Sequence, residues 1–407
     1  MAITGEVYRQ AFLNSAKPML SYGVPFSEAC RKHAEEYGVK KIYILASGTL
    51  SRNTDLLQDL ERALDGMVVG ERIGMTPHTL ISEVVEVLHD VRRTGADCIV
   101  TLGGGSLSDA AKAITFAEAN DVQTREDLLN LPHMMAKDRP SQPTRMPYIL
   151  IPSTLSGGEY SSYSGVTDEQ TNIKYQLCNL EPANVVILSG ELAATTPEDV
   201  WIASGVRAID HCCENLCTFK KEEPWAVVEK AQLDGLKLLV PNLLKTLEDP
   251  RDATARFNCQ LGVVLSLFGL QYNVYPGCSH GIGHILGPMG VSHGKTSAVL
   301  MPAVHKYNAS INEKDQSVVR RTLWSIPEAA DLFEACGLQR DGADLGDLLD
   351  AIIRRLGMPR SLTEVGITGE EKLQQLARNS MADPCVHMNP RKIEGPEQVL
   401  EILRMCT

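Results

Sequence analysis

Residues 98–113, CIVTLGGGSLSDAAKA, contain a short apolar run, three glycines and a helix-like pattern in immediate succession. An apolar run of this length that ends in glycine predicts a buried strand. The glycines let the backbone approach a ligand closely. Ser106 can open a helix that carries Asp109 and Lys112, and the free N–H groups at its start suit a pyrophosphate. The stretch matches neither G-x-G-x-x-G nor the phosphate loop that ends in GK[ST]. It predicts a phosphate-binding turn, with a strand-to-helix turn that binds nothing as the alternative.

The chain before this turn alternates strand and helix patterns. Residues 41–47, KIYILAS, predict a strand, and leucines in 56–64 predict a helix after it. A short strand follows at 67–69, and apolar residues in 80–91 mark one face of a helix that stops near Gly95. Strands separated by helices of this length predict right-handed crossovers and a mainly parallel sheet, whose ligands bind beyond the carboxyl ends of the strands.

The second half of the chain has a different pattern. Residues 120–147 are polar and proline-rich, and they predict a surface segment before another strand. Beyond about residue 188 strand-like runs become scarce, and long helical patterns cover 225–247 and 253–272. We therefore expect an α/β domain over 1–188 and an all-helical domain over 189–407.

Composition restricts the class of protein. The 407 residues are 43% hydrophobic, as in a globular enzyme, and the formal charge of −12 argues against nucleic acid as a partner. No run approaches the roughly 18 apolar residues of a membrane span, and the N-terminus lacks the features of a signal peptide. Eleven cysteines without framework spacing fit reduced thiols. We expect a cytoplasmic protein that acts on small molecules.

Residues 278–294, CSHGIGHILGPMGVSHG, gather three of the ten histidines. If the middle of this stretch is helical, His280 and His284 are four residues apart on one face, and His293 returns to them through a Gly/Pro turn. A glutamate after the first histidine would indicate a zinc protease, but Gly281 stands there. The stretch predicts a functional site, and the alternative is a packed helix whose histidines bond to backbone carbonyls.

Five motifs together resemble one enzyme family. GGGSLSDAAKA at 103–113 resembles the GGGSxxDxxK signature of the iron-containing (group III) alcohol dehydrogenases, which include the maleylacetate reductases. MTPHT at 75–79, IPST at 151–154 and NPR at 389–391 are similar to three further family segments. The block at 278–294 resembles the family's HGxxHxLGxxxxxxHG, although its histidine spacing is one residue shorter. All five occur in the family's order.

The resemblance implies the dehydroquinate synthase-like fold, with a Rossmann-like dinucleotide-binding domain, a helical domain and an active site in the cleft between them. It also implies a homodimer and a nicotinamide cofactor. The implied cofactor-binding residues are Ser47, Gly104, Gly105, Ser106, Asp109, Ser153 and Thr154. Many relatives carry an acidic residue after the second strand that excludes NADPH, but here Ser47-Gly48 stands there and Arg52 follows. This favours NADPH, and NADH remains open.

The sequence departs from the family at the metal site. Metal-binding members carry G-x-D-A-x-x-H-A-x-E, where the aspartate and histidine are ligands, whereas residues 205–214 read GVRAIDHCCE. His211 matches the histidine, but Arg207 replaces the aspartate. A guanidinium cannot bind a metal, and its charge opposes a divalent cation. Asp210 lies about 100° around the helix from His211 and would need a distortion to substitute. Thr196 is the expected N-cap of this helix.

Two interpretations follow for these histidines. In the first, His211, His280 and His293 still bind Fe²⁺ or Zn²⁺ and leave one position open for substrate. In the second, no metal binds. Arg207 and the histidines then polarise a carbonyl or bind a substrate carboxylate.

Other features favour the maleylacetate reductase branch. The loop that begins at Ser153 is one residue shorter than in most alcohol dehydrogenases of the family, as in the reductases. We therefore expect an NAD(P)H-dependent reduction of a ketone, an oxoacid or a conjugated double bond. The expected catalytic residues are His284 for proton transfer, Arg207, His211 and His280 at the reacting group, and Lys174 for a substrate anion. The alternatives are a metal-dependent alcohol dehydrogenase, a lyase that retains NAD, and an inactive dinucleotide-binding protein.

Overall fold

A computed structural model describes residues 5–219, 221 and 223–407. The chain divides into two compact units, Met1–Thr196 and Pro197–Thr407. This division falls shortly after the boundary that we expected at residue 188. Each unit is described by itself.

The first unit is built on a seven-stranded sheet with strand order β1-β2-β9-β6-β5-β3-β4. β1 pairs antiparallel with β2, and every other neighbouring pair is parallel. The mainly parallel sheet is therefore confirmed. The strands are β1 Val7–Gln10, β2 Met19–Tyr22, β3 Ile42–Ala46, β4 Val68–Ile73, β5 Cys98–Gly103, β6 Tyr148–Pro152 and β9 Val185–Ile187.

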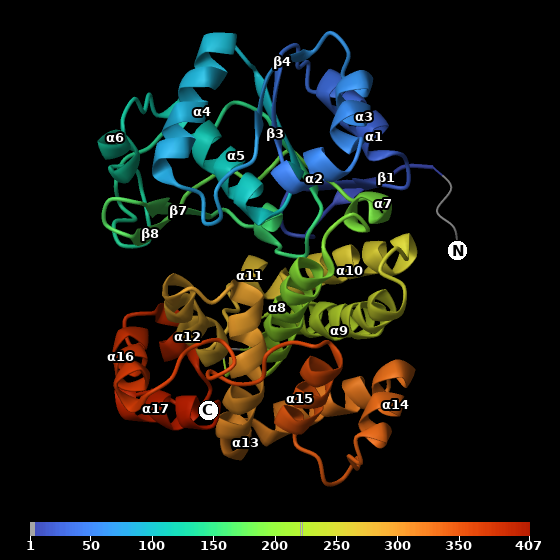
Figure 1. The fold of residues 1–407 in the computed structure, drawn as a ribbon, viewed down its shortest axis with the longest axis vertical. Coiled ribbons are helices and arrows are strands. Elements are labelled where there is room, and N and C mark those ends of the chain that lie inside the picture. The colour runs from blue at the N-terminus through green and yellow to red at the C-terminus, as the bar shows by residue number, and fades with distance from the viewer. Residues whose placement is uncertain (1–4, 220, 222) are drawn as a thin grey trace. The chain divides into compact units, whose positions relative to one another are not determined.

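Helices cover both faces of this sheet (Figure 1). α1 (Phe26–Glu36) and α3 (Leu56–Ala63) pack on one face, together with α2 (Gly48–Asn53), around the apolar side chains of β3, β5, β6 and β9. α4 (Ile81–Thr94) and α5 (Gly105–Ala119) lie on the other face. β3, β5 and β6 are buried throughout, which explains their near-continuous apolar sequence.

Several short elements of this unit were not predicted. α6 (Arg125–Leu129) lies in the expected surface segment and begins at a capping box on Thr124. β7 (Ser164–Asp168) and β8 (Ile173–Leu177) form an antiparallel pair outside the main sheet. η1 (Gly158–Tyr160) precedes this pair, and α7 (Gly190–Ala193) follows β9.

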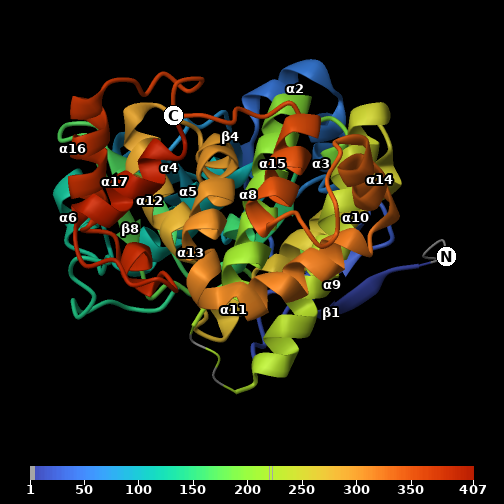
Figure 2. The same cartoon turned by 90° about the horizontal axis from the view of Figure 1, so that it is seen from below.

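The described residues of the second unit form helices and no strands, as predicted for an all-helical domain. The long helix α13 contacts α8, α12, α15 and α17 (Figure 2). The elements are α8 Glu198–Leu216, α9 Trp225–Glu248, α10 Ala253–Ser266, α11 Phe268–Gln271, α12 Cys278–Leu286, η2 Gly287–Met289, α13 His293–Trp324, α14 Pro327–Ala335, α15 Leu345–Arg355, α16 Glu370–Ser380, η3 Pro384–Met388 and α17 Pro396–Arg404.

Two local predictions were wrong. Thr196 is not the N-cap of α8, because its hydroxyl donates to the carbonyl of Ser153 at 2.6 Å and Pro197 takes the N-cap position. The expected single helix over 253–272 is interrupted at Leu267, which separates α10 from α11.

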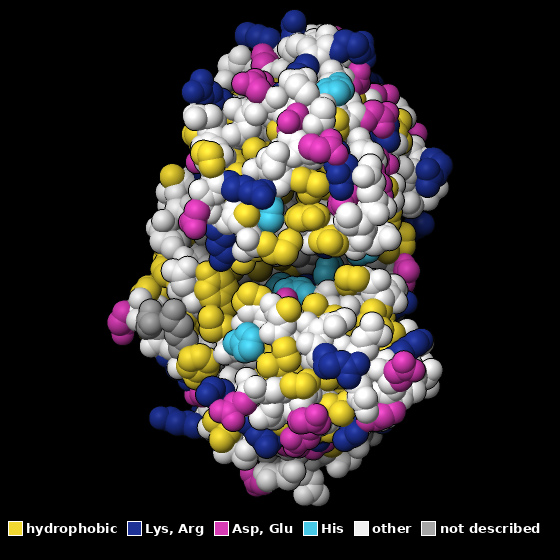
Figure 3. Space-filling view, turned by 90° about the vertical axis from the view of Figure 1, so that its left-hand side faces the viewer, with side chains coloured by type: hydrophobic (Ala, Val, Ile, Leu, Met, Phe, Trp, Pro, Cys, Tyr) yellow, Lys and Arg dark blue, Asp and Glu magenta, His cyan; other side chains and the backbone are white. Residues whose placement is uncertain are grey.

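The surface carries charged side chains of both signs, as the composition predicts. On the face drawn in Figure 3, basic and acidic side chains are interspersed. Among the helices of the described ranges, none combines the length and the apolarity of a bilayer span.

Candidate functional site

The glycine turn between β5 and α5 brings three segments of the first unit together. A Cβ atom on Gly103 would lie 2.6 Å from Cδ1 of Leu107 and 2.8 Å from Cβ of Ser47. A Cβ on Gly105 would lie 2.7 Å from Oγ of Ser156. Only glycine lets the ends of β3 and β5 and the loop after β6 approach this closely. The first amides of α5 have no partner within their own helix, so the turn fits a pyrophosphate.

The predicted cofactor residues lie around this turn. Gly104 is the N-cap of α5, and a Cβ built on it would lie 3.1 Å from Cγ2 of Thr154. Ser153 donates its N–H to the carbonyl of Gly103 at 3.0 Å. Ser47 directly follows β3 and, as the N-cap of α2, accepts the N–H of Leu50 with its side chain. The structure thus gathers Ser47, Gly104, Gly105, Ser106, Ser153 and Thr154 at the carboxyl ends of β3, β5 and β6. Their contact with a cofactor stays a prediction.

A network of buried polar side chains joins α5, the helix after the turn, to η1. Lys112 is 1% exposed, and its Nζ lies 3.0 Å from Oδ1 of Asp109 and donates to the carbonyl of Gly158 at 2.8 Å. Glu159 is also buried, accepts the Ser108 hydroxyl at 2.7 Å, and has its pKa raised by that burial. The network ties η1 to α5. Asp109 and Lys112 were predicted on this helix from the sequence, whereas no local pattern marks Glu159 as their neighbour.

The segment 75–79 holds strained backbone beside the same turn. His78 and Thr79 have φ values of 72° and 56°, a region that β-branched residues rarely adopt. The Thr79 hydroxyl donates to the carbonyl of Ser106 at 3.1 Å. Such strain persists where the surroundings hold it in place, and it is common next to binding sites.

Lys174 lies on β8 with an exposed side chain. Burial and the charge of Lys174 both lower the pKa of His78. The structure thus places Lys174 in the first unit, near the segment 75–79. Its predicted contact with a substrate anion stays a prediction.

The second unit brings the four predicted histidines together. The ring centroids of His211 and His280 are 4.3 Å apart, those of His280 and His284 are 6.4 Å apart, and those of His284 and His293 are 6.3 Å apart. α8 contributes the first of these side chains, α12 the next two, and the start of α13 the last. A Cβ on Gly294 would lie 2.0 Å from the carbonyl oxygen of Ala203, so this glycine lets α13 begin directly against α8.

Two buried carboxyl groups of α8 position His280. Glu214 accepts the backbone N–H of Ser279 at 2.8 Å, and its Oε2 lies 2.8 Å from Nδ1 of His280. Asp210 accepts the Ser279 hydroxyl at 2.7 Å, and burial raises its pKa to about 6. Burial, reinforced by Asp210, raises the pKa of Glu214. Nε2 of His280 is buried and has no hydrogen-bond partner among the residues that the structure describes.

His211 and His280 are neutral near neutral pH. Burial, with help from the charge of Arg207, lowers the pKa of His211 to about 3. The same causes, burial first, hold the pKa of His280 well below its usual range. Neutral imidazoles carry one lone pair each, which can accept a hydrogen bond or bind a metal.

Arg207 brings a positive charge into this site, where no ion pair joins it to a carboxylate of the described residues, although Asp210 attracts it. Its Nη1 is buried and donates no hydrogen bond within the described ranges, and its Nη2 lies 3.4 Å from Nε2 of His284. Burial lowers the pKa of Arg207, yet a guanidinium stays protonated in proteins. A buried cation with an unused donor is unfavourable unless a ligand completes its contacts.

The predicted trio of His211, His280 and His293 is not among the groups of donor atoms that lie close enough together to hold a metal in the described residues. In the described part of the chain, two sets of three donor atoms lie within 4.8 Å of one another, namely Asp210, Glu214 and His280, and His284, Asp383 and Cys385. Neither set contains more than one residue of the predicted trio. The fixed charge of Arg207 also opposes a cation. The three-histidine metal site therefore remains only a prediction from the sequence.

Comparisons with known proteins agree with this architecture. Residues 21–189 match the family described as iron-containing alcohol dehydrogenase, and residues 201–407 match its C-terminal domain. Dehydrogenase FUM7 of Gibberella moniliformis is 36% identical over 429 aligned positions, which cover all of both chains.

Solved structures show the same fold. Maleylacetate reductase from Agrobacterium tumefaciens superposes with a TM-score of 0.74 at 22% identity, over 100% of this chain and 98% of that one. Sulfoacetaldehyde reductase from Bifidobacterium kashiwanohense, solved with NAD⁺, has a TM-score of 0.79 at 19% identity, over 95% and 96% of the two chains. The protein belongs to the iron-containing alcohol dehydrogenase family and is an NAD(P)-dependent oxidoreductase.

Proposed function

We propose that this enzyme reduces a ketone, an oxoacid or a conjugated double bond with NAD(P)H, in the manner of a maleylacetate reductase and without a metal. The observation that carries the proposal is Arg207. It occupies the place of the family's aspartate ligand, and it presents a buried Nη1 without a partner in the described residues. An anionic group or a developing oxyanion is the ligand that such a donor binds best.

The proposed reaction divides the work among a few groups. Bound NAD(P)H supplies a hydride to the carbon of the substrate. Arg207 stabilises the negative charge that develops on the substrate oxygen, because a cation that is already held in place needs little reorganisation during the step. His284, whose side chain is 36% exposed, delivers the proton that completes the alcohol or the saturated acid. The glycine turn of the first unit is the proposed binding site for the cofactor phosphates.

The substrate is proposed to carry a carboxylate. The neutral His211 and His280 cannot repel an anion, and Arg207 attracts one. Lys174, exposed in the first unit, is a second proposed contact for an anionic group. Maleylacetate, which has both a carbonyl and carboxylates, is the natural first compound to test.

A metal-dependent alcohol dehydrogenase is the second candidate function. The pair of Glu214 and His280 supports it, because a carboxylate bonded to one imidazole nitrogen often orients the other nitrogen toward a metal. In this alternative His211, His280 and His293 bind Fe²⁺ or Zn²⁺. The charge of Arg207 argues against it.

One assay separates the two candidates. NADPH and NADH oxidation is measured with maleylacetate after treatment with a strong chelator. We expect turnover, and we expect Arg207→Ala to reduce kcat/KM about 10²- to 10³-fold. The control is Arg320→Ala, which removes an arginine that pairs with Glu313 on α13. Activity that returns only after Fe²⁺ or Zn²⁺ is added would contradict the metal-free mechanism. Absence of turnover in both conditions would contradict maleylacetate as a substrate.

We further propose a cytoplasmic homodimer. β1 lies at one edge of the sheet, and Leu13 shortly after it is 75% exposed, which suits a contact between copies. Analytical ultracentrifugation tests the dimer, and Leu13→Glu is expected to weaken it. A monomer at all concentrations would contradict this part. Fractionation of cells tests the location.

A further inference from the structure

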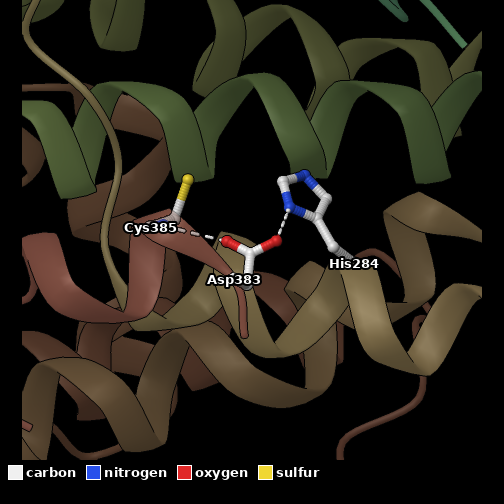
Figure 4. Close-up of side chains that lie close together, drawn as sticks. All are labelled: His284, Asp383 and Cys385. Carbon is white, nitrogen blue, oxygen red and sulfur yellow. Dashed lines mark hydrogen bonds and ion pairs between the residues drawn. The ribbon is translucent and has the colours of Figure 1, made fainter. Parts of the chain in front are cut away.

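We propose that Asp383 positions His284 as the proton donor by fixing which of its ring nitrogens carries the permanent proton. The inference rests on the proposed reductase function. Nδ1 of His284 lies 2.9 Å from Oδ2 of Asp383, although the two residues are 99 positions apart in the chain (Figure 4). Asp383 directly precedes η3, and its side chain is 13% exposed.

An aspartate carboxylate only accepts hydrogen bonds, so Nδ1 of His284 must donate. The second nitrogen, Nε2, is then the atom that gains and loses the catalytic proton. It faces Nη2 of Arg207 at 3.4 Å. The group that delivers the proton therefore lies beside the group that is proposed to stabilise the oxyanion.

The local fold holds the carboxylate of Asp383 in this orientation. Its other oxygen, Oδ1, accepts the backbone N–H of Cys385 at 2.9 Å and caps η3. A Cβ on Gly281 would lie 2.6 Å from Cγ2 of Val386 and 3.2 Å from Oδ1 of Asp383. Gly281 thus lets η3 pack directly on α12, one helical turn before His284. Gly281, which stands where a zinc protease has a glutamate, thus leaves room for Asp383 beside α12.

The proton balance is simple. The Nε2–H bond of protonated His284 breaks as the proton passes to the reduced substrate, and neutral imidazole remains with its proton on Nδ1. Solvent returns the proton to Nε2, because the His284 side chain is partly exposed. Asp383 is therefore a positioning residue, which acts through His284 and does not contact the substrate.

Asp383→Asn tests this role with little change of shape. The amide oxygen still caps η3 through the Cys385 N–H, but the amide NH₂ now faces His284 and donates to it. Nδ1 must then accept, so the neutral ring carries its proton on Nε2. We expect kcat to fall about 10²-fold, while KM and the affinity for NADPH stay unchanged. Asp249→Asn is the matched control, because Asp249 also precedes a proline and accepts an N–H two residues on, from Arg251 at 2.9 Å.

The tautomer itself provides a readout that a purely structural role would not change. In ¹⁵N-histidine-labelled protein, His284 is assigned by its loss in His284→Gln. We expect the proton on Nδ1 in the wild type and on Nε2 in Asp383→Asn. A wild-type proton on Nε2, or a variant with unchanged kcat, would overturn the proposal. If the wild type reduces no carbonyl compound, the proposed function fails, whereas the tautomer still tests whether Asp383 sets the state of His284.

Discussion

The glycine turn of the first unit and the histidine site of the second unit are built in opposite ways. The turn uses backbone amides, and the polar side chains beneath it, such as Lys112 and Glu159, have their partners. The histidine site uses side chains, and Nη1 of Arg207 and Nε2 of His280 have no hydrogen-bond partner among the described residues. A site made of backbone tolerates many side-chain changes. A site made of side chains changes its chemistry with one substitution.

The unpaired donors and acceptors of the histidine site have an energetic meaning. A buried polar atom without a hydrogen bond costs about 1–3 kcal/mol. Nη1 of Arg207 on α8 and Nε2 of His280 on α12 are two such atoms, and a substrate can supply the hydrogen bonds that they lack. The turn does not carry a comparable free-energy cost. A ligand reaches its free backbone amides because the glycines permit a close approach. The comparison predicts large effects of charge at Arg207 and smaller, steric effects at the turn.

The largest expected effect comes from restoring the family's aspartate. Arg207→Asp replaces a cation with a carboxylate one helical turn from His211, so it removes the proposed oxyanion donor and adds a metal ligand. We expect reduction in the presence of chelator to fall about 10³-fold. We also expect one equivalent of Zn²⁺ to bind by calorimetry, whereas the wild type binds none.

Arg207→Leu separates the two parts of this change. It removes the charge without adding a ligand, so it should lose activity but bind no Zn²⁺. Equal Zn²⁺ binding by the wild type and Arg207→Asp would show that Arg207 does not exclude the metal. The contrast between the two regions would then not depend on this residue.

The second prediction concerns another unpaired histidine of the helical unit. His305 is 1% exposed, neither of its ring nitrogens has a partner within the described ranges, and burial lowers its pKa to about 4. The unfolded chain binds this proton below about pH 6.5, whereas the folded chain does so only below about pH 4. Stability is therefore lost as the pH falls through this window. The full loss is about 3 kcal/mol.

His305→Leu removes this dependence. We measure the free energy of unfolding in urea at pH 7.5 and pH 4. Between these two pH values it should fall about 3 kcal/mol less in the variant than in the wild type. Exposed Ile311, which has no ionisable group, supplies the control, since Ile311→Leu should leave the pH dependence unchanged. Parallel pH profiles for the wild type and His305→Leu would show that His305 has the same pKa in the folded and the unfolded chain.

The two regions also differ in how far the sequence predicted them. The turn at Gly103–Gly105 and the helix that ends at Gly95 follow from residue types whose backbone effects are local, and both are confirmed. The gathering of His280 and His284 on one helix followed from their spacing. Their functional roles remain predictions.

Contacts between residues far apart in the chain could not be predicted from the sequence. Asp383 and Glu214 each bond to a histidine from another segment, and no local pattern marks either partnership. Glu159 was missed for the same reason. Thr196 shows the opposite error. The local pattern predicted it as an N-cap, but its hydroxyl donates to the carbonyl of Ser153, which is distant in the sequence. Local signals predicted the elements, whereas tertiary hydrogen bonds decided which polar groups pair.

The third prediction breaks the turn by steric means. Gly105→Ala places a methyl group 2.7 Å from Oγ of Ser156, so the loop after β6 must move away from the start of α5. We expect the Kd for NADPH to rise about tenfold, or about 1.4 kcal/mol, by fluorescence titration. Gly158→Ala is the control, because its new Cβ meets no atom closer than 3.9 Å. Unchanged affinity in Gly105→Ala would exclude this turn as the phosphate site.

The smallest effect is expected at the edge of the turn, where the cofactor preference is proposed to be set. Arg52 is exposed and has no ion pair among the residues that the structure covers, and its Nη1 would lie 3.2 Å from a Cβ on Gly48. It is therefore free to attract a 2′-phosphate. Arg52→Ala should lower kcat/KM for NADPH roughly fivefold, or about 1 kcal/mol, and leave NADH unchanged.

Gly48→Asp sharpens this test from the other side. The new carboxylate would pair with Arg52 and repel a 2′-phosphate, so the preference should shift toward NADH further than in Arg52→Ala. Arg62→Ala removes an exposed arginine of α3 that pairs with Asp59, and it should change neither cofactor. If neither Arg52→Ala nor Gly48→Asp alters the ratio of NADPH to NADH activity, side chains beyond the end of β3 do not set the preference. The turn would then bind the cofactor through its backbone alone.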